Sequence, residues 1–370
     1  MLRRLTLGLF TLACAAAIAA CSTGNTTPSS GGVPGTGPNF VTNTIYVSDT
    51  TQNAVDIYTP SPGPSATPQY LIGGSSSSLD GPSYLAFDSS KNLYVTNYGA
   101  STKVGSVTIY KTFATGNVIP FGSASLGGEQ PHGIAMIPSN GGFVVAFTQP
   151  GGFFSNGIAV YAPFRGPGNA FQTNLIAGSN TNLNNPIGVA VDANKNIYAA
   201  NSGGGNITVY TLPTPSPTPS GSPSPTPSPT PTPTAAPSGA PTPTPSPSPT
   251  PFSQNLPPTE TITCACLKQP TGLAFDGSGN LYVTDPASSP AAVYEFPAAQ
   301  LASGTVSPSR TLTGAVNPTD VTIDSSGTIY VVDAGNAPGK SMLLIYAAGA
   351  STPATSIALP GTATGIALSP

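Results

Sequence analysis

Charged side chains are scarce in this chain: 6% of its residues are Asp, Glu, Lys or Arg, against about 25% in typical soluble proteins. The formal net charge is −3, and the ten basic residues form no cluster. Nucleic-acid binding requires a basic patch, so the composition argues against a nucleic-acid partner. Ser, Thr and Asn supply the polarity instead, and a neutral surface of this kind suits a protein that works outside the cytoplasm.

Histidine and cysteine are also rare. The chain has one histidine, His132, and four cysteines, so it is not a scaffold built on disulfides. No nucleophile elbow, phosphate loop or paired zinc motif occurs in the sequence. We therefore expect no cofactor, no metal site and no assembled set of catalytic residues. His132 could act as a general base or a metal ligand, but a lone histidine in a repeat is more often a packed side chain.

Cys264 and Cys266 are the only thiols expected in the folded part. Residues two apart in a strand lie about 6.5 Å apart along it, so a disulfide between them requires a turn at this point. Two thiolates alone make a weak metal site. The sequence leaves the redox state of this pair open.

Long apolar runs are lacking as well. The longest begins at Leu5, after Arg3 and Arg4, and ends at Ala17, which is signal-peptide length and too short to span a bilayer. It leads into Ile18-Ala19-Ala20-Cys21, which resembles the bacterial lipobox. The resemblance implies cleavage of residues 1–20 and lipidation of Cys21, with a membrane as partner through the acyl chains. An ordinary secretory signal is the alternative.

The residue after the cysteine is Ser22, whereas a signal for inner-membrane retention would resemble Asp. An outer-membrane or cell-surface location is therefore favoured. Residues 21–39, rich in Ser, Thr, Gly and Pro, are expected to form a flexible tether. Residues 213–251 repeat Pro-Thr and Pro-Ser, a composition that cannot bury a core and favours extended, disordered structure.

One pattern recurs between residues 40 and 370. Its clearest copy runs Pro270-Thr271-Gly272-Leu273-Ala274-Phe275-Asp276, then Gly279-Asn280-Leu281-Tyr282-Val283-Thr284-Asp285, then Val293-Tyr294-Glu295-Phe296. Similar copies begin at Pro82, Pro131, Pro186 and Pro318. Each run is short, rich in β-branched and aromatic residues, and bounded by Gly, Asn, Asp or Pro, which is typical of strands. A fourth strand is expected after each copy, at Tyr70–Ile72, 118–121, 175–176, 261–263, 311–312 and 356–359.

Four antiparallel strands per repeat of 40 to 50 residues are typical of a β-propeller blade. A further copy begins at Ala363 and stops at Leu368, and its missing strands stand at the other end of the chain, from Thr44 to Ile72. We therefore predict an all-β, six-bladed propeller whose last blade joins N- and C-terminal strands, with residues 213–251 inserted within one blade.

The pattern from Pro270 to Phe296 resembles the NHL repeat, and the likeness extends over nearly all of residues 40–370. The resemblance implies a six-bladed propeller of a class that includes binding scaffolds, lyases and metal-dependent lactonases. The lactonases place a glutamate in the channel. None of the three glutamates here stands at such a position, which argues against a lactonase.

Polar residues end the second strand of most repeats, at the face where the first strand begins. We expect one mouth of the central channel to carry them, with a polar ligand bound there or, alternatively, with each side chain capping its own loop. The candidate ligand-binding residues are Asp49, Asn97, His132, Asn201, Asp285, Asp320 and Asp333.

The sequence thus predicts a cell-envelope lipoprotein that acts as a non-catalytic binding or scaffold propeller. Its ligand at the channel mouth would be a protein, a glycan or a small molecule. The alternative is an envelope hydrolase or lyase, lactonase-like, that uses His132 and the carboxylates of the same mouth.

Overall fold

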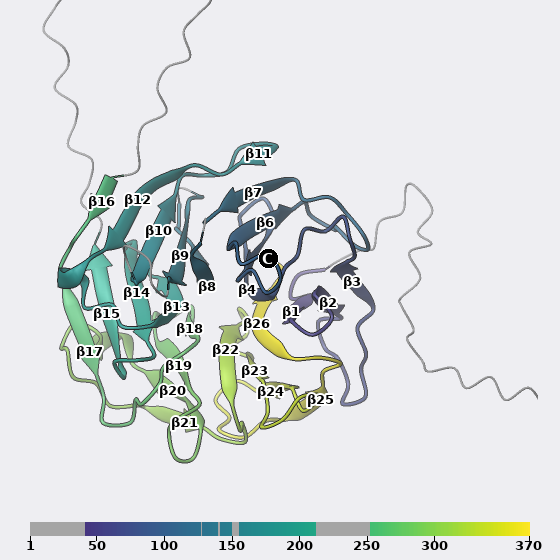
Figure 1. Cartoon of the computed structure of the whole chain (residues 1–370). Helices are drawn as coiled ribbons and strands as arrows, with labels where there is room; N and C mark the ends of the chain where they lie inside the picture. The colour runs from purple at the N-terminus through teal and green to yellow at the C-terminus, as the bar shows by residue number, and fades with distance from the viewer. Residues whose placement is uncertain (1–40, 127, 140, 150–154, 212–251) are drawn as a thin grey trace, which may run out of the picture.

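The computed structural model describes residues 41–126, 128–139, 141–149, 155–211 and 252–370. The predicted signal peptide, the lipobox with Cys21, the tether and the Pro-rich segment 213–251 therefore lie outside the described residues. Within the described part, six sheets, each built on four antiparallel strands, surround a common centre, which confirms the predicted six-bladed propeller (Figure 1). No helix among the described residues is long and apolar enough to cross a membrane.

Each blade runs from an inner strand at the channel to an outer strand. Blade 1 consists of β4 (Pro82–Phe87), β5 (Leu93–Asn97), β6 (Ser106–Tyr110) and β7 (Gly122–Ser125). Blade 2 consists of β8 (Gln130–Met136), β9 (Phe143–Thr148), β10 (Asn156–Tyr161) and β12 (Gln172–Ala177). Blade 3 consists of β13 (Pro186–Val191), β14 (Asn196–Asn201), β15 (Asn206–Thr211) and β17 (Glu260–Thr263).

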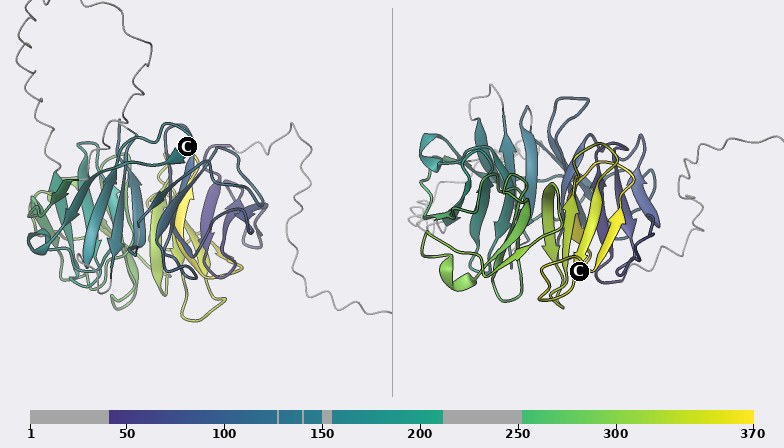
Figure 2. Two further views of the ribbon diagram at one scale, coloured as in Figure 1. Left: turned by 45° about the horizontal axis from the view of Figure 1, so that its top comes forward. Right: turned by 90° about the horizontal axis from the view of Figure 1, so that it is seen from below.

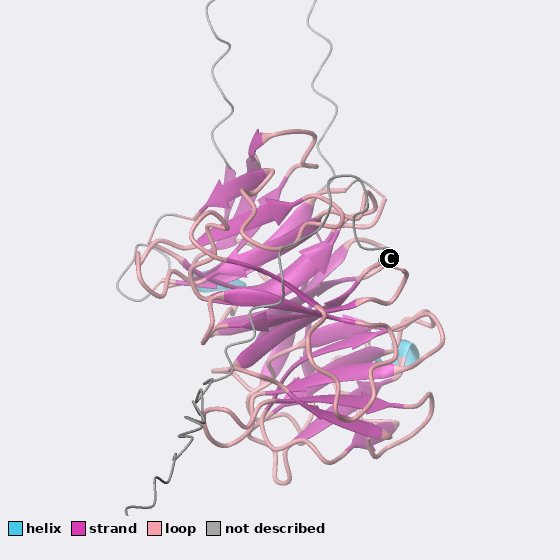
Figure 3. Ribbon diagram, turned by 90° about the vertical axis from the view of Figure 1, so that its right-hand side faces the viewer, coloured by secondary structure: helices cyan, strands magenta, loops and turns pink. Residues whose placement is uncertain are grey.

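The remaining blades follow the same plan. Blade 4 consists of β18 (Leu273–Phe275), β19 (Leu281–Asp285), β20 (Ala292–Phe296) and β21 (Arg310–Leu312). Blade 5 consists of β22 (Pro318–Ile323), β23 (Ile329–Asp333), β24 (Met342–Tyr346) and β25 (Thr355–Ala358). Blade 6 consists of β26 (Ala363–Leu368), β1 (Ile45–Asp49), β2 (Ala54–Tyr58) and β3 (Tyr70–Gly73). Two single-turn 3-10 helices, Ser179–Thr181 and Ala298–Gln300, lie in connections (Figure 3).

The hydrophobic core lies between blades. One cluster packs Tyr46, Val55 and Ile57 of blade 6 against residues of blade 1 that include Leu93 and Val95. Because a blade is covered by a neighbour on each face, middle strands such as β1 and β5 are buried along their whole length. That double cover explains why the sequence shows continuous apolar runs instead of strict alternation.

The outer edges of several blades are covered by the next blade along the chain. The connection between the third and fourth strands of one blade reaches back and pairs with the outer strand of the blade before it. In blade 2 this connection contains β11 (Gly168–Asn169), which pairs with β7 of blade 1. In blade 3 it contains β16 (Phe252–Gln254), which pairs with β12 of blade 2. Shorter bridges join Gly116 to Ile72 and Thr305 to Thr263. These pairings reduce the number of open strand edges.

One predicted strand is wrong. The fourth strand of blade 1 is β7, at Gly122–Ser125, and not the more apolar run at residues 118–121. Pro120 in that run has no amide to donate to a ladder, and Ile119 is 80% exposed. Phe164 of blade 2 covers Gly122 so closely that a Cβ there would lie 2.1 Å from its ring. The apolar cover of β7 therefore comes from the next blade.

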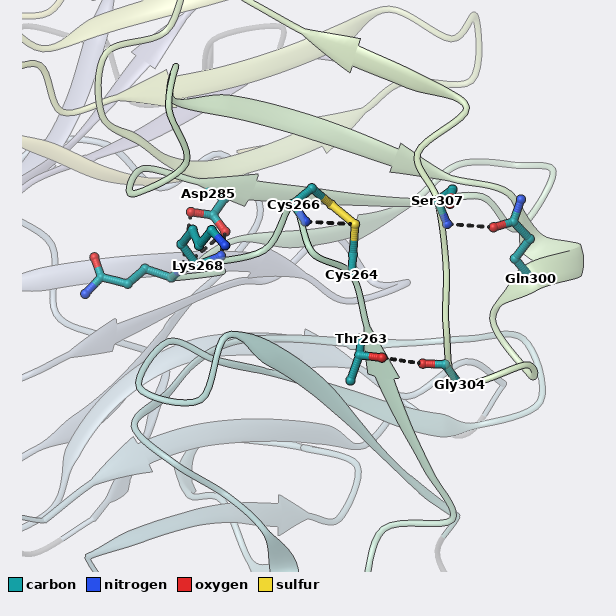
Figure 4. The surroundings of a disulfide bond; sticks show 9 residues. Thr263, Cys264, Cys266, Lys268, Asp285, Gln300, Gly304 and Ser307 are labelled. Carbon is teal, nitrogen blue, oxygen red and sulfur yellow. Dashed lines mark hydrogen bonds between the residues drawn. A yellow bond between two sulfur atoms is a disulfide. The ribbon is translucent and has the colours of Figure 1, made fainter.

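Cys264 and Cys266 form a disulfide in the turn that follows β17 (Figure 4). The amide of Leu267 donates to the carbonyl of Cys264, and the next amides, of Lys268 and Gln269, donate to Asp285. A disulfide between residues two apart was expected to need a turn, and the structure has a turn there. The closed loop is short, so the bond constrains the unfolded chain little.

The ring closes where the two ends of the propeller meet. β26 pairs with β1, from Ile45 opposite Leu368 to Asp49 opposite Ala363. The side views in Figure 2 show this yellow C-terminal strand beside the purple N-terminal ones. The amide of Asn43 also donates to the carbonyl of Ser369, which extends the contact beyond the strands. The predicted closure is confirmed.

We predict that removal of residues 362–370 unfolds or aggregates the protein. Ile366 and Leu368 pack in the cluster between blades 5 and 6, and side chains of this size contribute about 1.5–3 kcal/mol each when buried. The lost ladder bonds add about 1 kcal/mol each, against a total stability of about 5–15 kcal/mol. Circular dichroism and thermal melting measure the effect. The matched control removes nine residues of the predicted tether, 22–30. Wild-type melting of the C-terminal truncation would contradict the closure.

Candidate functional site

The polar residues that end the second strands are buried beneath the loops of one face. Asp49, Asn97, Asn201, Asp285 and Asp333 are each at most 2% exposed. Asp285 accepts hydrogen bonds from the backbone amides of Lys268, Gln269, Ala287 and Ser288. Asp333 accepts from the amides of Val316, Asn317 and Gly335.

The other three residues make bonds of the same kind. Asn97 and Asn201 accept from the amides of Asp80 and Asn184, and Asp49 accepts from those of Thr51 and Gln52. Each side chain therefore holds the loops around it, as the capping interpretation expected, although the second carboxylate oxygen of Asp49, Oδ2, is buried without a hydrogen-bond partner. A role for these residues toward a ligand stays a prediction.

His132 lies on β8 and is separate from these carboxylates. Its Nε2 is 3.0 Å from the hydroxyl of Thr148 on β9. Burial lowers the pKa of His132 to about 4, so the imidazole is neutral at physiological pH. The pair joins the first two strands of blade 2.

A layer of glycines brings the inner strands together. The third residue of the repeat is Gly in four blades, at Gly133, Gly188, Gly272 and Gly365. A Cβ on Gly188 would lie 2.0 Å from the carbonyl oxygen of Thr271, and one on Gly365 would lie 2.1 Å from that of Ser83. Any side chain would therefore separate neighbouring inner strands.

Blades 1 and 5 depart from glycine at this position. They carry Tyr84 and Asp320, which lie on either side of the inner strand of blade 6. The Tyr84 hydroxyl donates to the carbonyl of Thr319, 3.2 Å away, so this side chain links blade 1 to blade 5. Asp320 is 7% exposed and accepts hydrogen bonds from the amides of Val321 and Ile366, both at 3.0 Å.

A cavity of about 360 Å³ occupies the channel on one side of this layer. All six inner strands line it, from Tyr84 and Asp320 to residues at the strand ends such as Phe87, Phe275 and Leu368. Alternate residues of a strand share a face, and two residues after the glycine position stand alanines in five blades and Thr322 in blade 5. These residues line the cavity, and the alanines also pack against the apolar clusters between blades.

The cavity lies toward the opposite face from the predicted mouth. Among the seven candidate residues, Asp320 alone lines it. The strand ends at this face lead into hairpins in which Asp88, Asp192, Asp276 and Asp324 accept hydrogen bonds from their own turns. The structure thus separates Asp320 from Asp49, Asn97, His132, Asn201, Asp285 and Asp333.

Tyr84 was missed by the sequence analysis. The signal that could have found it is the break in the repeat: tyrosine stands where four of the six copies have glycine. Departures from local rules are expected at functional or strained sites.

No family model matches the sequence, and no curated protein matches it. Solved structures do match. A chain of the nidogen/laminin complex has a TM-score of 0.52 at 16% identity, covering 88% of this chain and 98% of that one. A protein of unknown function from Bacteroides caccae has a TM-score of 0.56 at 9% identity, covering 89% and 99%. These likenesses show the propeller fold.

Carboxyl groups that are buried or partly buried in the folded chain make stability depend on pH. Burial raises the pKa of Asp56, Glu129 and Asp320 to about 7, and for Asp56 the nearby Asp49 adds to the effect. Their ordinary values are 3.8 and 4.5, so the folded chain binds more protons than the unfolded chain across the interval up to about pH 7. Stability should fall as pH rises through this interval. Burial lowers the pKa of His132 from 6.5 to about 4, so the contribution of this group to stability rises with pH. This single group opposes the trend that the carboxyl groups set.

We therefore predict a lower melting temperature at pH 8 than at pH 5.5. Asp56→Asn should lessen the difference, because the amide needs no proton to be buried neutral. Asp192→Asn, in the hairpin turn between β13 and β14, is the matched control and should keep the wild-type slope. A melting temperature that rises from pH 5.5 to pH 8 in the wild type would contradict the prediction.

Proposed function

We propose that this chain is a non-catalytic binding propeller of the cell envelope, related to NHL-repeat propellers and attached to a membrane through a lipid on Cys21. The observation that carries the binding role is the cavity in the channel, which six inner strands enclose and Asp320 and Tyr84 close at one end. Pockets that bind small molecules combine apolar side chains with a few placed polar groups. The residues that line this cavity are mostly apolar, with Tyr84, Asp320 and Thr322 as the polar side chains, and polar atoms, those of the backbone included, contribute more than half of its surface.

The site differs from the mouth expected from the sequence. Most polar groups of that mouth are engaged by loop amides, whereas the cavity on the other side of the glycine layer has Asp320 among its lining residues. We therefore place the binding site at Asp320 and Tyr84, with apolar walls that include Phe87, Met136 and Phe275.

Binding in the cavity can be tested by thermal-shift screening of small molecules against the purified propeller. A ligand present at a hundred times its Kd stabilises the folded state by about 2.7 kcal/mol. Ala274→Leu, which places a larger side chain at the cavity, should abolish the shifts, and Ala347→Leu at an exposed position should keep them. Thermal shifts that persist in Ala274→Leu would show that the ligand binds outside this cavity. Steady turnover of a lactone would favour the hydrolase alternative.

The membrane attachment rests on the lipobox-like residues 18–21 and on the short apolar run before them. We predict that Cys21→Ala moves the protein from the membrane fraction to the soluble fraction, because the acyl chains supply the attachment. Cys14→Ala, within the predicted signal peptide, is the matched control and should stay with the membrane. Metabolic labelling with a fatty acid gives the direct readout. A Cys21→Ala protein that remains labelled and membrane-bound would overturn the lipoprotein assignment.

A further inference from the structure

We propose that the channel cavity binds a small organic cation, an amine or quaternary ammonium on an apolar body, with Asp320 as its counter-ion. The inference rests on the proposed binding function and names the class of ligand. It follows from the contacts of one carboxylate and from the walls around it.

Asp320 is a buried carboxylate with spare capacity for hydrogen bonds. An ionised carboxylate offers about four acceptor positions, and Asp320 uses two of them, for the amides of Val321 and Ile366. Asp285, which is also buried, accepts from four backbone amides. Asp320 therefore accepts fewer bonds than Asp285. Asp49 also accepts from two amides, but of these three aspartates only Asp320 lines the cavity.

No positive charge balances Asp320 within the cavity. None of the lining residues, all of which belong to the described chain, is Lys, Arg or His. The ion pair found among the described residues joins Arg310 and Glu295 in blade 4. Lys91 donates to the carbonyl of Pro370, at the cavity rim, from an exposed position. Burying a charge without a partner is costly, so a cationic ligand would offset the free-energy cost of ionising Asp320.

The walls favour an organic cation over a metal ion. Phe87, Met136, Phe275 and Leu368 offer apolar and aromatic surface, and aromatic rings attract cations through their faces. Calcium requires six to eight oxygen ligands, whereas Asp320 is the one side-chain carboxylate among the described residues that line the cavity. The volume of about 360 Å³ is that of a small-molecule site.

The test compares three probes that differ in charge on the same body: 4-phenylbutylamine, 4-phenylbutanol and 4-phenylbutyrate. Isothermal titration calorimetry is run with the whole propeller at pH 8, above the pKa of about 7 to which burial raises Asp320, so the carboxylate is ionised. The amine should bind about tenfold or more tightly than the alcohol, and the carboxylate more weakly still. Asp320→Asn should weaken the amine to the level of the alcohol and leave the alcohol unchanged.

Thr322→Val provides the matched control, because Thr322 also lines the cavity on β22 but carries no charge. It should keep the wild-type preference for the amine. If Asp320→Asn fails to fold, the ranking of the three probes on the wild-type protein still decides the question. Equal binding of all three probes would overturn the cation assignment and leave the binding cavity standing. A preference for the amine that survives in Asp320→Asn would overturn Asp320 as the counter-ion. If the amine does not bind, the cation assignment fails, and the thermal-shift screen separately decides whether the cavity binds anything.

Discussion

The close approach of the six inner strands is the constraint on which the rest of the structure depends. It requires glycine at the third position of the repeat, because at Gly188 and Gly365 even a Cβ would lie about 2 Å from a neighbouring carbonyl oxygen. This close packing of the inner strands brings each blade against the next, where the apolar clusters lie. The central cavity is lined by the same strands whose packing stabilises the fold.

Ring closure and edge cover solve the problem that sheets with open edges tend to pair with other chains. β26 joins β1 across the two ends of the propeller, and connections such as β11 and β16 pair with the outer strand of the preceding blade. β15 and β17 pair although residues 212–259 separate them in the sequence. The connection between third and fourth strands is thus the place where the fold accommodates extra length, at a cost that rises slowly with length.

Much of the fold could be predicted from the sequence because the same pattern of strands and turns recurs several times along the chain. The copy from Pro270 to Phe296 gave the strand order, and the fragment from Ala363 to Leu368 gave the closure. The fourth strand of blade 1 was harder to predict from the sequence, since Gly122 in β7 is covered by Phe164, which lies in another blade. The site was only partly predictable for a related reason. Polarity at Asp285 and Asp333 marked a mouth, but polarity alone does not distinguish a side chain that meets ligand from one that meets loop amides.

Because charged side chains are scarce, the surroundings of each buried carboxylate are informative. In a chain with few cations, a buried carboxylate is stabilised mainly by backbone amides, and the aspartates at the ends of the second strands obtain them from their loops. Asp320 stands in the glycine layer instead, where the neighbouring strand offers the single amide of Ile366. Tyr84, the other departure from glycine, bonds to the carbonyl of Thr319, the residue just before Asp320. Tyr84 packs in the core cluster between blades 1 and 2, which accounts for a large side chain at that position, whereas no apolar cluster of the described residues includes Asp320. Both residues line the cavity, and that placement ties the two departures to it.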